Sequence, residues 1–103
     1  MPALRFNHME LTLPPGGLER DRDAIVTFYS EVFGFNPIDV PLFDTAGLLL
    51  ATDDEVSQFL LLMEQEEHLQ SPGYDHLGFL YDSREEVDEM LAKCKQWQEK
   101  DDR

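Results

Sequence analysis

The stretch FNHMELTL, residues 6–13, has a counterpart later in the chain, YDHLGFLY, residues 74–81. The two stretches align at an offset of 68 positions (76 − 8 = 68), which places His8 on His76. Each starts with an aromatic residue, and a helical pattern follows each copy. Because self-similarity at a fixed offset marks repeated structural units, the sequence predicts two related modules, each opening with a strand.

The two faces of the first predicted strand, at residues 5–13, differ in polarity. The apolar set is Met9, Leu11 and Leu13, and the polar set is His8, Glu10 and Thr12. Since successive side chains of a strand point to opposite sides, each set shares one face. A polar face in so small a domain predicts a cleft or solvent on that side of the sheet.

A helix is predicted over residues 20–33. Its apolar positions recur with helical spacing: Ile25, Phe28, Tyr29, Val32 and Phe33. Asp21 is the predicted N-cap. Gly34 is placed to end the helix in a left-handed conformation.

Three further strands are predicted before the second copy. Pro37 and Pro41 confine the first of them to a short edge strand, because proline cannot donate to a ladder. A turn is predicted at residues 44–47. The predicted strands cover residues 38–40, 48–52 and 57–63, and the apolar run in the last of them predicts a strand covered on both faces.

The second copy leads into another predicted helix. Ser83 and Glu86 form a capping box at its start, in which the Ser83 hydroxyl accepts from the amide of Glu86. The apolar stripe of this helix consists of Val87, Met90, Leu91, Cys94 and Trp97. Cys94 is the one cysteine, so an internal disulfide is excluded, and its place on the stripe predicts a small buried side chain.

The composition excludes several classes of function. A chain of 103 residues suits one domain. Its formal net charge of −14, from 22 acidic and 8 basic residues, argues against a nucleic-acid partner and against an anionic membrane surface. No apolar stretch approaches the roughly 20 residues that span a bilayer, and nothing resembles a signal peptide. A cytoplasmic protein is therefore predicted.

His8 and His76 are candidate metal ligands. Neutral imidazole is a common ligand for Fe, Zn, Ni and Mn, and two histidines with one carboxylate suit non-haem Fe(II). An open coordination position would let such a metal polarise a carbonyl or bind dioxygen. The alternative is that both are strand histidines, partly buried and hydrogen-bonded.

The segments HMELTL (residues 8–13), FYSEVFGF (28–35) and DHLGFLYD (75–82) resemble the vicinal oxygen chelate superfamily. That superfamily includes glyoxalase I, the extradiol dioxygenases, and the fosfomycin and bleomycin resistance proteins. The resemblance extends over residues 4–97. It implies an α+β fold of paired βαβββ modules in a single glyoxalase-like domain, residues 1–103. The first module would cover residues 4–64, a linker 65–73, and a partial second module of strand and helix only 74–103.

The resemblance also implies that the two histidines hold a divalent metal. Glyoxalase I enzymes add a glutamate on the last strand of the first module, where the central inward positions here would be Leu60 or Leu62. Gln58 and Glu64 would point to the same side of that strand as Leu60 and Leu62, but they lie at its ends. Dioxygenases and fosfomycin-type transferases instead use a glutamate on the final strand of the second module. This sequence does not include that strand, so the third ligand is not named.

Two functions follow from the resemblance. The first is a metal-dependent enzyme acting on a small molecule, either a ring-cleaving dioxygenase or a related lyase or transferase. The second is a metal-free binding or sequestering protein of the bleomycin-resistance kind, with Glu10 and Gln58 as polar groups of the cleft. Glu10 could equally be an exposed strand carboxylate. Because superfamily members commonly pair modules across a dimer, a homodimer is expected.

Overall fold

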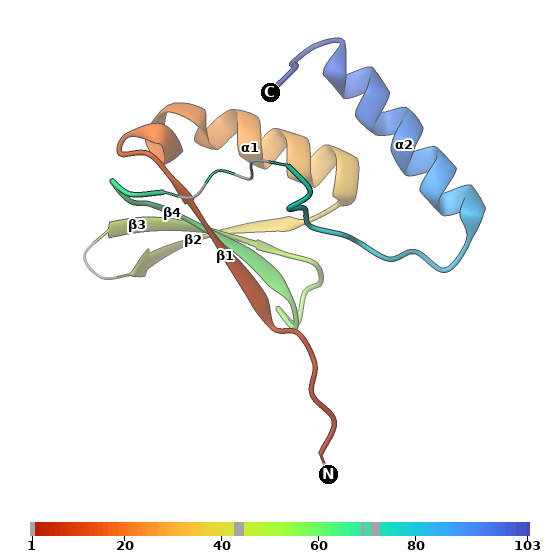
Figure 1. The fold of residues 1–103 in the computed structure, drawn as a ribbon, viewed down its shortest axis with the longest axis horizontal. Coiled ribbons are helices and arrows are strands. Elements are labelled where there is room, and N and C mark those ends of the chain that lie inside the picture. The colour runs from red at the N-terminus through yellow and green to blue at the C-terminus, as the bar shows by residue number, and fades with distance from the viewer. Residues whose placement is uncertain (1, 43–44, 69, 71–72) are drawn as a thin grey trace. The chain divides into compact units, whose positions relative to one another are not determined.

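The computed structural model describes residues 2–42, 45–68, 70 and 73–103. The chain forms two compact units, a first unit at Met1–Leu69 and a second unit at Gln70–Arg103. The predicted α+β composition is confirmed, with strands and helices in the order β1, α1, β2, β3, β4, α2 (Figure 1). The elements are β1 (His8–Leu13), α1 (Gly17–Phe33), β2 (Asn36–Leu42), β3 (Thr45–Ala51), β4 (Phe59–Glu64) and α2 (Arg84–Gln98).

The first unit is a βαβββ module. Its four strands form one sheet in the order β1-β4-β3-β2. β1 and β4 run parallel, and the β4–β3 and β3–β2 pairs are antiparallel. α1 crosses one face of this sheet (Figure 1).

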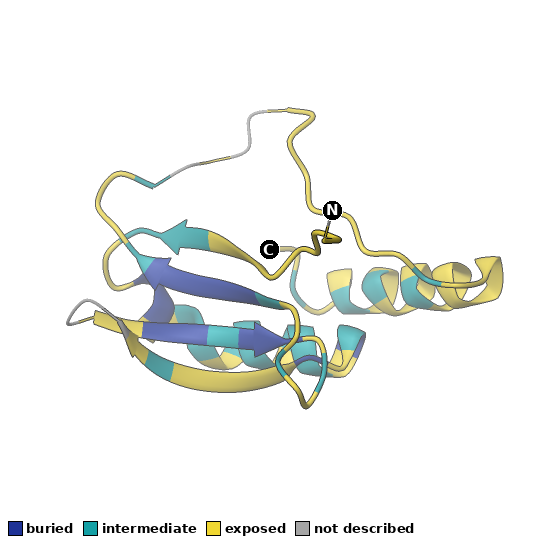
Figure 2. Ribbon diagram, turned by 90° about the horizontal axis from the view of Figure 1, so that it is seen from below, coloured by how far each residue is buried: buried dark blue, intermediate teal, exposed yellow. Residues whose placement is uncertain are grey.

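The core of the first unit lies between α1 and the sheet. Its buried members are Leu18, Phe35, Leu48, Leu50, Leu60 and Leu62, with Leu11, Leu13, Ile25, Val26, Tyr29 and Phe33 packed against them. Figure 2 shows the buried residues concentrated on β3 and β4. The apolar set predicted for β1 contributes Leu11 and Leu13, whereas Met9 remains 44% exposed. Phe28 packs edge-on against the rings of Tyr29 and Phe33.

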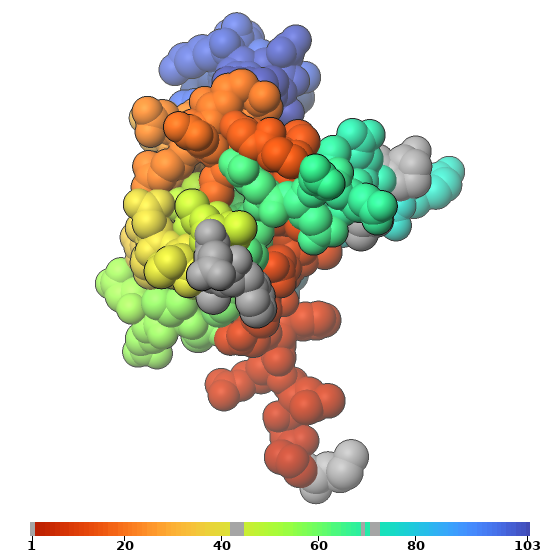
Figure 3. Space-filling view, turned by 90° about the vertical axis from the view of Figure 1, so that its left-hand side faces the viewer, coloured from red at the N-terminus to blue at the C-terminus, as the bar shows by residue number. Residues whose placement is uncertain are grey.

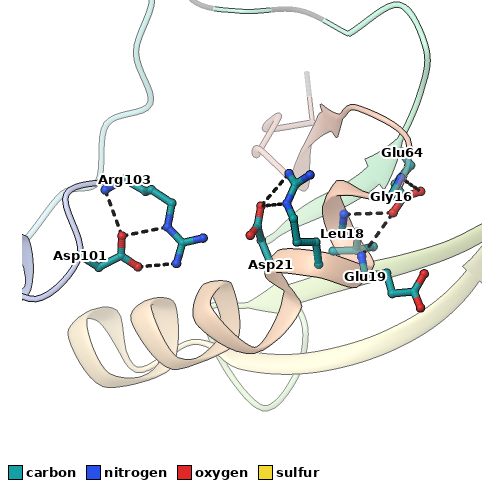
Figure 4. Close-up of polar contacts among 8 residues, drawn as sticks. Gly16, Leu18, Glu19, Asp21, Glu64, Asp101 and Arg103 are labelled. Carbon is teal, nitrogen blue, oxygen red and sulfur yellow. Dashed lines mark hydrogen bonds and ion pairs between the residues drawn. The ribbon is translucent and has the colours of Figure 1, made fainter.

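α1 begins earlier than the sequence predicted, and the predicted N-cap is wrong. The helix starts at Gly17, and Asp21 lies inside its first turns, paired with Arg20. The N-cap is Gly16, which carries no side chain that could accept a hydrogen bond. The carboxylate of Glu64, from the end of β4, accepts from the backbone amides there instead (Figure 4). The cap is thus supplied by a distant strand, which local sequence does not reveal.

The other end of α1 is as predicted. Gly34 adopts a left-handed conformation, with φ of 73°. Its amide donates to the Ser30 carbonyl and the Phe35 amide to the Tyr29 carbonyl, so the last turn of the helix is closed.

β2 is the edge strand that the prolines indicated, but it is longer than predicted. It includes both Pro37 and Pro41. An edge strand pairs on one side only, so a proline is tolerated where its missing N–H would face away from the partner. β3 begins at Thr45, so the predicted turn over residues 45–47 is wrong, and Asp44 lies outside the described residues.

β1 and β4 are shorter than predicted at their N-terminal ends. They begin at His8 and Phe59, which face each other in the parallel ladder. Residues 2–7 project from the first unit as an arm (Figure 3), and Leu4 and Phe6 on it are almost fully exposed.

The second unit contains α2 but not the predicted strand. Residues 74–81 form neither helix nor strand, and no ladder joins them to another described segment. A strand requires a partner edge to satisfy its backbone groups, and no described strand is paired with this stretch. The Ser83 cap is confirmed, since its Oγ accepts from the Glu86 amide at 3.2 Å. Cys94, predicted to be buried, is partly exposed.

Candidate metal centre

One face of the sheet carries polar side chains, as the alternation in β1 predicted. Because Leu11, Leu60 and Leu62 pack into the core under α1, the alternate residues point to the opposite, open face. The register of β1 and β4 pairs three sets of residues on this open face: His8 with Phe59, Glu10 with Leu61, and Thr12 with Met63. Leu61 and Met63 are buried. The polar side chains next to them on this face come from β1.

The prediction that Leu60 or Leu62 would occupy the inward positions of β4 is wrong. Both side chains belong to the core beneath α1. The β4 residue that faces His8 is Phe59. The β4 positions on the open face are therefore apolar, and none offers a carboxylate to a metal beside His8. The error arose because an uninterrupted apolar strand gives no alternation from which to assign its faces.

His8 is exposed, but its ring is held in place. Its Nδ1 lies 2.7 Å from Oδ1 of Asn7. The ring stacks on that of Phe59, with centroids 4.8 Å apart and planes inclined by 3°. The residue before the strand and the residue across the ladder thus orient the imidazole together.

His76 is also exposed, and it belongs to the second unit. Its Nδ1 lies 2.7 Å from the backbone carbonyl oxygen of Tyr74. The two candidate ligands therefore come from different units. Within the described part of the chain, no three His, Cys, Asp or Glu side chains cluster in a way that could hold a metal.

The two predicted polar groups of the cleft differ in position. Glu10 is exposed on the same face as His8, two residues along β1. Gln58 is exposed and precedes β4, where its backbone carbonyl accepts from the amide and the hydroxyl of Thr52. Gln58 therefore lies in the turn that leads into β4 rather than on the strand itself.

The remaining histidine is His68, in the segment after β4. It is partly buried, and its Nδ1 is buried without a hydrogen-bond partner among the residues that the structure describes. Nothing places it near the open face of the sheet.

A hollow of about 510 Å³ lies at the N-terminal end of α1, and no sequence motif predicted it. Arg22 and Asp39 in its lining form a two-pronged ion pair, with N–O distances of 3.0 and 2.8 Å. Glu64, also in its lining, accepts from the amides of Gly16, Leu18 and Glu19, and the first of these bonds contributes most to lowering the pKa of its carboxyl. Arg22, Asp39 and Glu64 are thus engaged in contacts within the fold, so the hollow does not offer these three charged groups freely to a ligand.

A βαβββ module with a histidine on its open face is typical of a glyoxalase-type protein. The chain belongs to the Glyoxalase/Bleomycin resistance protein/Dioxygenase superfamily, which it matches over residues 18–98. This confirms the resemblance and the fold class inferred from the sequence. No curated protein matches the chain.

Solved structures share the fold. A possible glyoxalase from Bacillus cereus is 24% identical, with a TM-score of 0.61, and the match covers 91% of this chain and 74% of that one. A point variant of the fosfomycin resistance protein FosX from Listeria monocytogenes, in complex with Mn(II) and 1S,2S-dihydroxypropylphosphonic acid, is 19% identical. Its TM-score is 0.65, and the match covers 93% of this chain and 71% of that one. These structural similarities establish the fold. They also show that one protein with this fold, FosX, binds Mn(II).

The described helices include none that is both long enough and apolar enough to cross a membrane.

Proposed function

We propose that this protein is a metal-dependent enzyme of the vicinal oxygen chelate type, in which His8 and His76 hold a divalent metal. The observation that carries the proposal is the setting of His8. Its imidazole is exposed on the open face of the sheet, stacked on Phe59 and anchored by Asn7. A metal ligand needs this combination of access and fixed orientation. The Mn(II) bound to the similarly folded FosX supports a metal of this kind.

The residues present fit a divalent metal in the chemistry of their donors. Two imidazole nitrogens suit Fe, Zn, Ni or Mn, and a bound metal would polarise an oxygen of a small-molecule substrate. Glu10, exposed on the same face as His8, would accept a proton or orient that substrate. Leu61 and Met63 form an apolar floor beside it, which would exclude water from one side of the reacting groups.

The position of Phe59 bears on which set of metal ligands, and therefore which reaction, the site can support. Because it occupies the β4 position facing His8, that strand supplies no glutamate next to the histidine. This disfavours the ligand set of glyoxalase I. It favours the set used by ring-cleaving dioxygenases and fosfomycin-type transferases, in which the two histidines are joined by a carboxylate from elsewhere in the assembly.

The test is metal content and metal titration of the purified protein. The wild-type protein should bind about one equivalent of Mn²⁺, Fe²⁺, Ni²⁺ or Zn²⁺. The double variant His8→Ala/His76→Ala should lose this binding. His68→Ala, which removes the remaining histidine, is the matched control and should retain it. Equal binding by the wild-type protein and the double variant would contradict the assignment.

The second candidate function is metal-free binding of a cationic small molecule, as in bleomycin resistance. The net charge of −14 and the exposed Glu10 on the open face support it. Under this alternative, bleomycin should bind in the presence of a metal chelator. Glu10→Gln should weaken that binding, whereas the double histidine variant should leave it unchanged. Binding that depends on metal and on both histidines would favour the enzyme.

We also propose that two copies associate. The second unit exposes large apolar side chains, among them Leu80 at 94% and Leu91 at 51%. Large apolar side chains left exposed on a domain surface are candidates for an interaction site. Sedimentation equilibrium should give a dimer, and Leu80→Lys/Leu91→Lys should shift it to monomer. A wild-type protein that remains monomeric at high concentration would exclude the dimer.

A further inference from the structure

The hydrogen bond of His76 determines which of its ring nitrogens carries the proton. Its Nδ1 lies 2.7 Å from the carbonyl oxygen of Tyr74. A backbone carbonyl can only accept, so Nδ1 must be the donor. In the neutral ring the lone pair then resides on Nε2. The nitrogen that can bind a metal is therefore the one at the far side of the ring.

The same result holds for His8, although its partner is an amide side chain. Asn7 could in principle turn either Oδ1 or Nδ2 toward the ring. Its Nδ2, however, donates to the carbonyl oxygen of Ser57 at 3.3 Å, which fixes the orientation of the amide. Oδ1 is thereby directed at Nδ1 of His8, 2.7 Å away, and accepts its proton. Nε2 of His8 again carries the lone pair.

The main chain holds Asn7 in this position. The Phe59 amide donates to the Asn7 carbonyl at 3.0 Å, which ties the residue to the start of β4. The ring of Phe59 lies flat against that of His8 and restricts its tilt. Ser57 and Phe59 therefore hold Asn7 in place, and Asn7 and Phe59 together hold the ring of His8.

We propose that Asn7 is a positioning residue that selects the Nδ1–H tautomer of His8, and that the Tyr74 carbonyl does the same for His76. In both histidines of the repeat, Nε2 then carries the lone pair that can bind a metal. Metal-binding histidines donate their other ring N–H to a carbonyl or carboxylate in this way, which fixes the tautomer and raises the basicity of the ligand. The role in metal binding rests on the proposed function, whereas the tautomers themselves do not.

The two positions differ in a way that supplies an internal control. The acceptor beside His8 is a side chain, so a substitution can remove it. The acceptor beside His76 belongs to the main chain, so it persists in every variant. A change at Asn7 should therefore affect one histidine and leave the other unaltered.

The experiment is ¹⁵N NMR of the imidazole nitrogens in metal-free protein, at a pH where the rings are neutral. Wild-type protein should show His8 and His76 as Nδ1–H tautomers. Asn7→Leu should convert His8 to a mixture of tautomers without changing His76. Asn7→Asp, which keeps an acceptor oxygen, should preserve the wild-type tautomer. A wild-type His8 protonated on Nε2 would overturn the proposal even if Asn7→Leu failed to fold, and so would an unchanged His8 in folded Asn7→Leu.

Titration with Zn²⁺ separates this inference from the proposed function. If both are correct, Asn7→Leu should bind Zn²⁺ about 10–100-fold more weakly than wild type, and Asn7→Asp should bind it nearly as well. Absence of Zn²⁺ binding in wild type, with the tautomers as expected, would reject the metal site and leave the tautomer assignment intact. Full Zn²⁺ affinity in Asn7→Leu would reject the positioning role of Asn7.

Discussion

The first and second units start from the same plan, a histidine-bearing stretch followed by a helix, but only the first builds a core. α1 buries Leu18 and Val32 and covers a sheet. None of the residues of α2, all of which the structure describes, is buried. β1 forms a full ladder with β4, whereas residues 74–81 pair with no other described segment.

The difference shows which elements of the repeat need contacts from distant parts of the chain in order to form. Both helices form, because apolar spacing acts within a few residues, although α1 takes its N-terminal cap from the distant Glu64. A strand forms only where a second strand accepts its hydrogen bonds. The first copy finds that edge in β4, far along the chain. The second copy has a similar alternation but is paired with no described strand, so the pattern alone does not make it a strand.

The largest expected effect tests the claim that only the first unit holds a core. Leu48 is fully buried, and Leu48→Ala should lower the free energy of unfolding by about 2–5 kcal/mol, through lost burial and a residual cavity. The matched change on α2, Leu91→Ala, removes a side chain that is 51% exposed and, at a concentration where the protein is monomeric, should alter this free energy by less than about 0.5 kcal/mol. Urea unfolding measures both. Equal losses would mean that α2 packs as closely as β3.

The order of the elements in the first unit could be predicted from the sequence, but their limits could not, and the strand predicted for the second copy does not form. The apolar spacing of α1 and the left-handed Gly34 depend on neighbouring residues, and both were predicted correctly. The start of α1 was misplaced because its amides are capped by Glu64, from a strand far along the chain. β2 was predicted too short because its prolines are tolerated on an edge, which only the sheet order reveals.

The second prediction concerns two carboxyl groups whose pKa values are lowered, one in each unit. Glu64 is lowered chiefly by the hydrogen bond from the Gly16 amide, and Asp101 is lowered to about 2 chiefly by the hydrogen bond from the Arg103 side chain (Figure 4). The Asp101 contact joins residues two apart and can persist in the unfolded chain, so its pKa changes little on folding. The Glu64 contact exists only in the folded sheet.

A depressed folded-state pKa stabilises a protein above the unfolded pKa, and this stabilisation is lost as the pH falls through the folded value. Glu64→Gln should therefore lower Tm at neutral pH, by less than Leu48→Ala does, and should weaken the fall in Tm between neutral pH and about pH 3. Asp101→Asn should change neither. Calorimetry across this pH range measures the Tm of both variants. If the two variants behaved alike, the result would contradict the long-range cap.

The candidate site could be predicted in part. The polar face of β1, with His8 and Glu10, was read from a simple alternation and lies where it was expected. The faces of β4 were misassigned because its apolar run has no alternation, so the place of Phe59 beside His8 appeared only in the register. The contact of Asn7 with Ser57 joins residues 50 positions apart, and no local motif predicts it.

The third prediction compares the two ways in which the helices are capped. Ser83 caps α2 from the adjacent position, and Ser83→Ala should destabilise that helix by about 0.5–2 kcal/mol. The loss should appear as faster amide hydrogen exchange in α2, with exchange in β3 and β4 unchanged. Ser83→Asp should retain the cap and the slow exchange. Faster exchange throughout the first unit would show that the stability of the two units is coupled.

The smallest effect concerns ion pairs. Arg22 and Asp39 join α1 to β2 through two hydrogen bonds, whereas Arg84 and Asp88 lie one turn apart on α2, 3.6 Å from each other. Both pairs are solvent-accessible, so Asp39→Asn should cost at most about 1 kcal/mol and Asp88→Asn about 0.3–0.5 kcal/mol. Only the first should change global urea unfolding, since it fastens a helix to a sheet, and high salt should reduce its effect. If Asp88→Asn had the larger global effect, α2 would contribute to the stability of the whole chain, and the contrast between the units would fail.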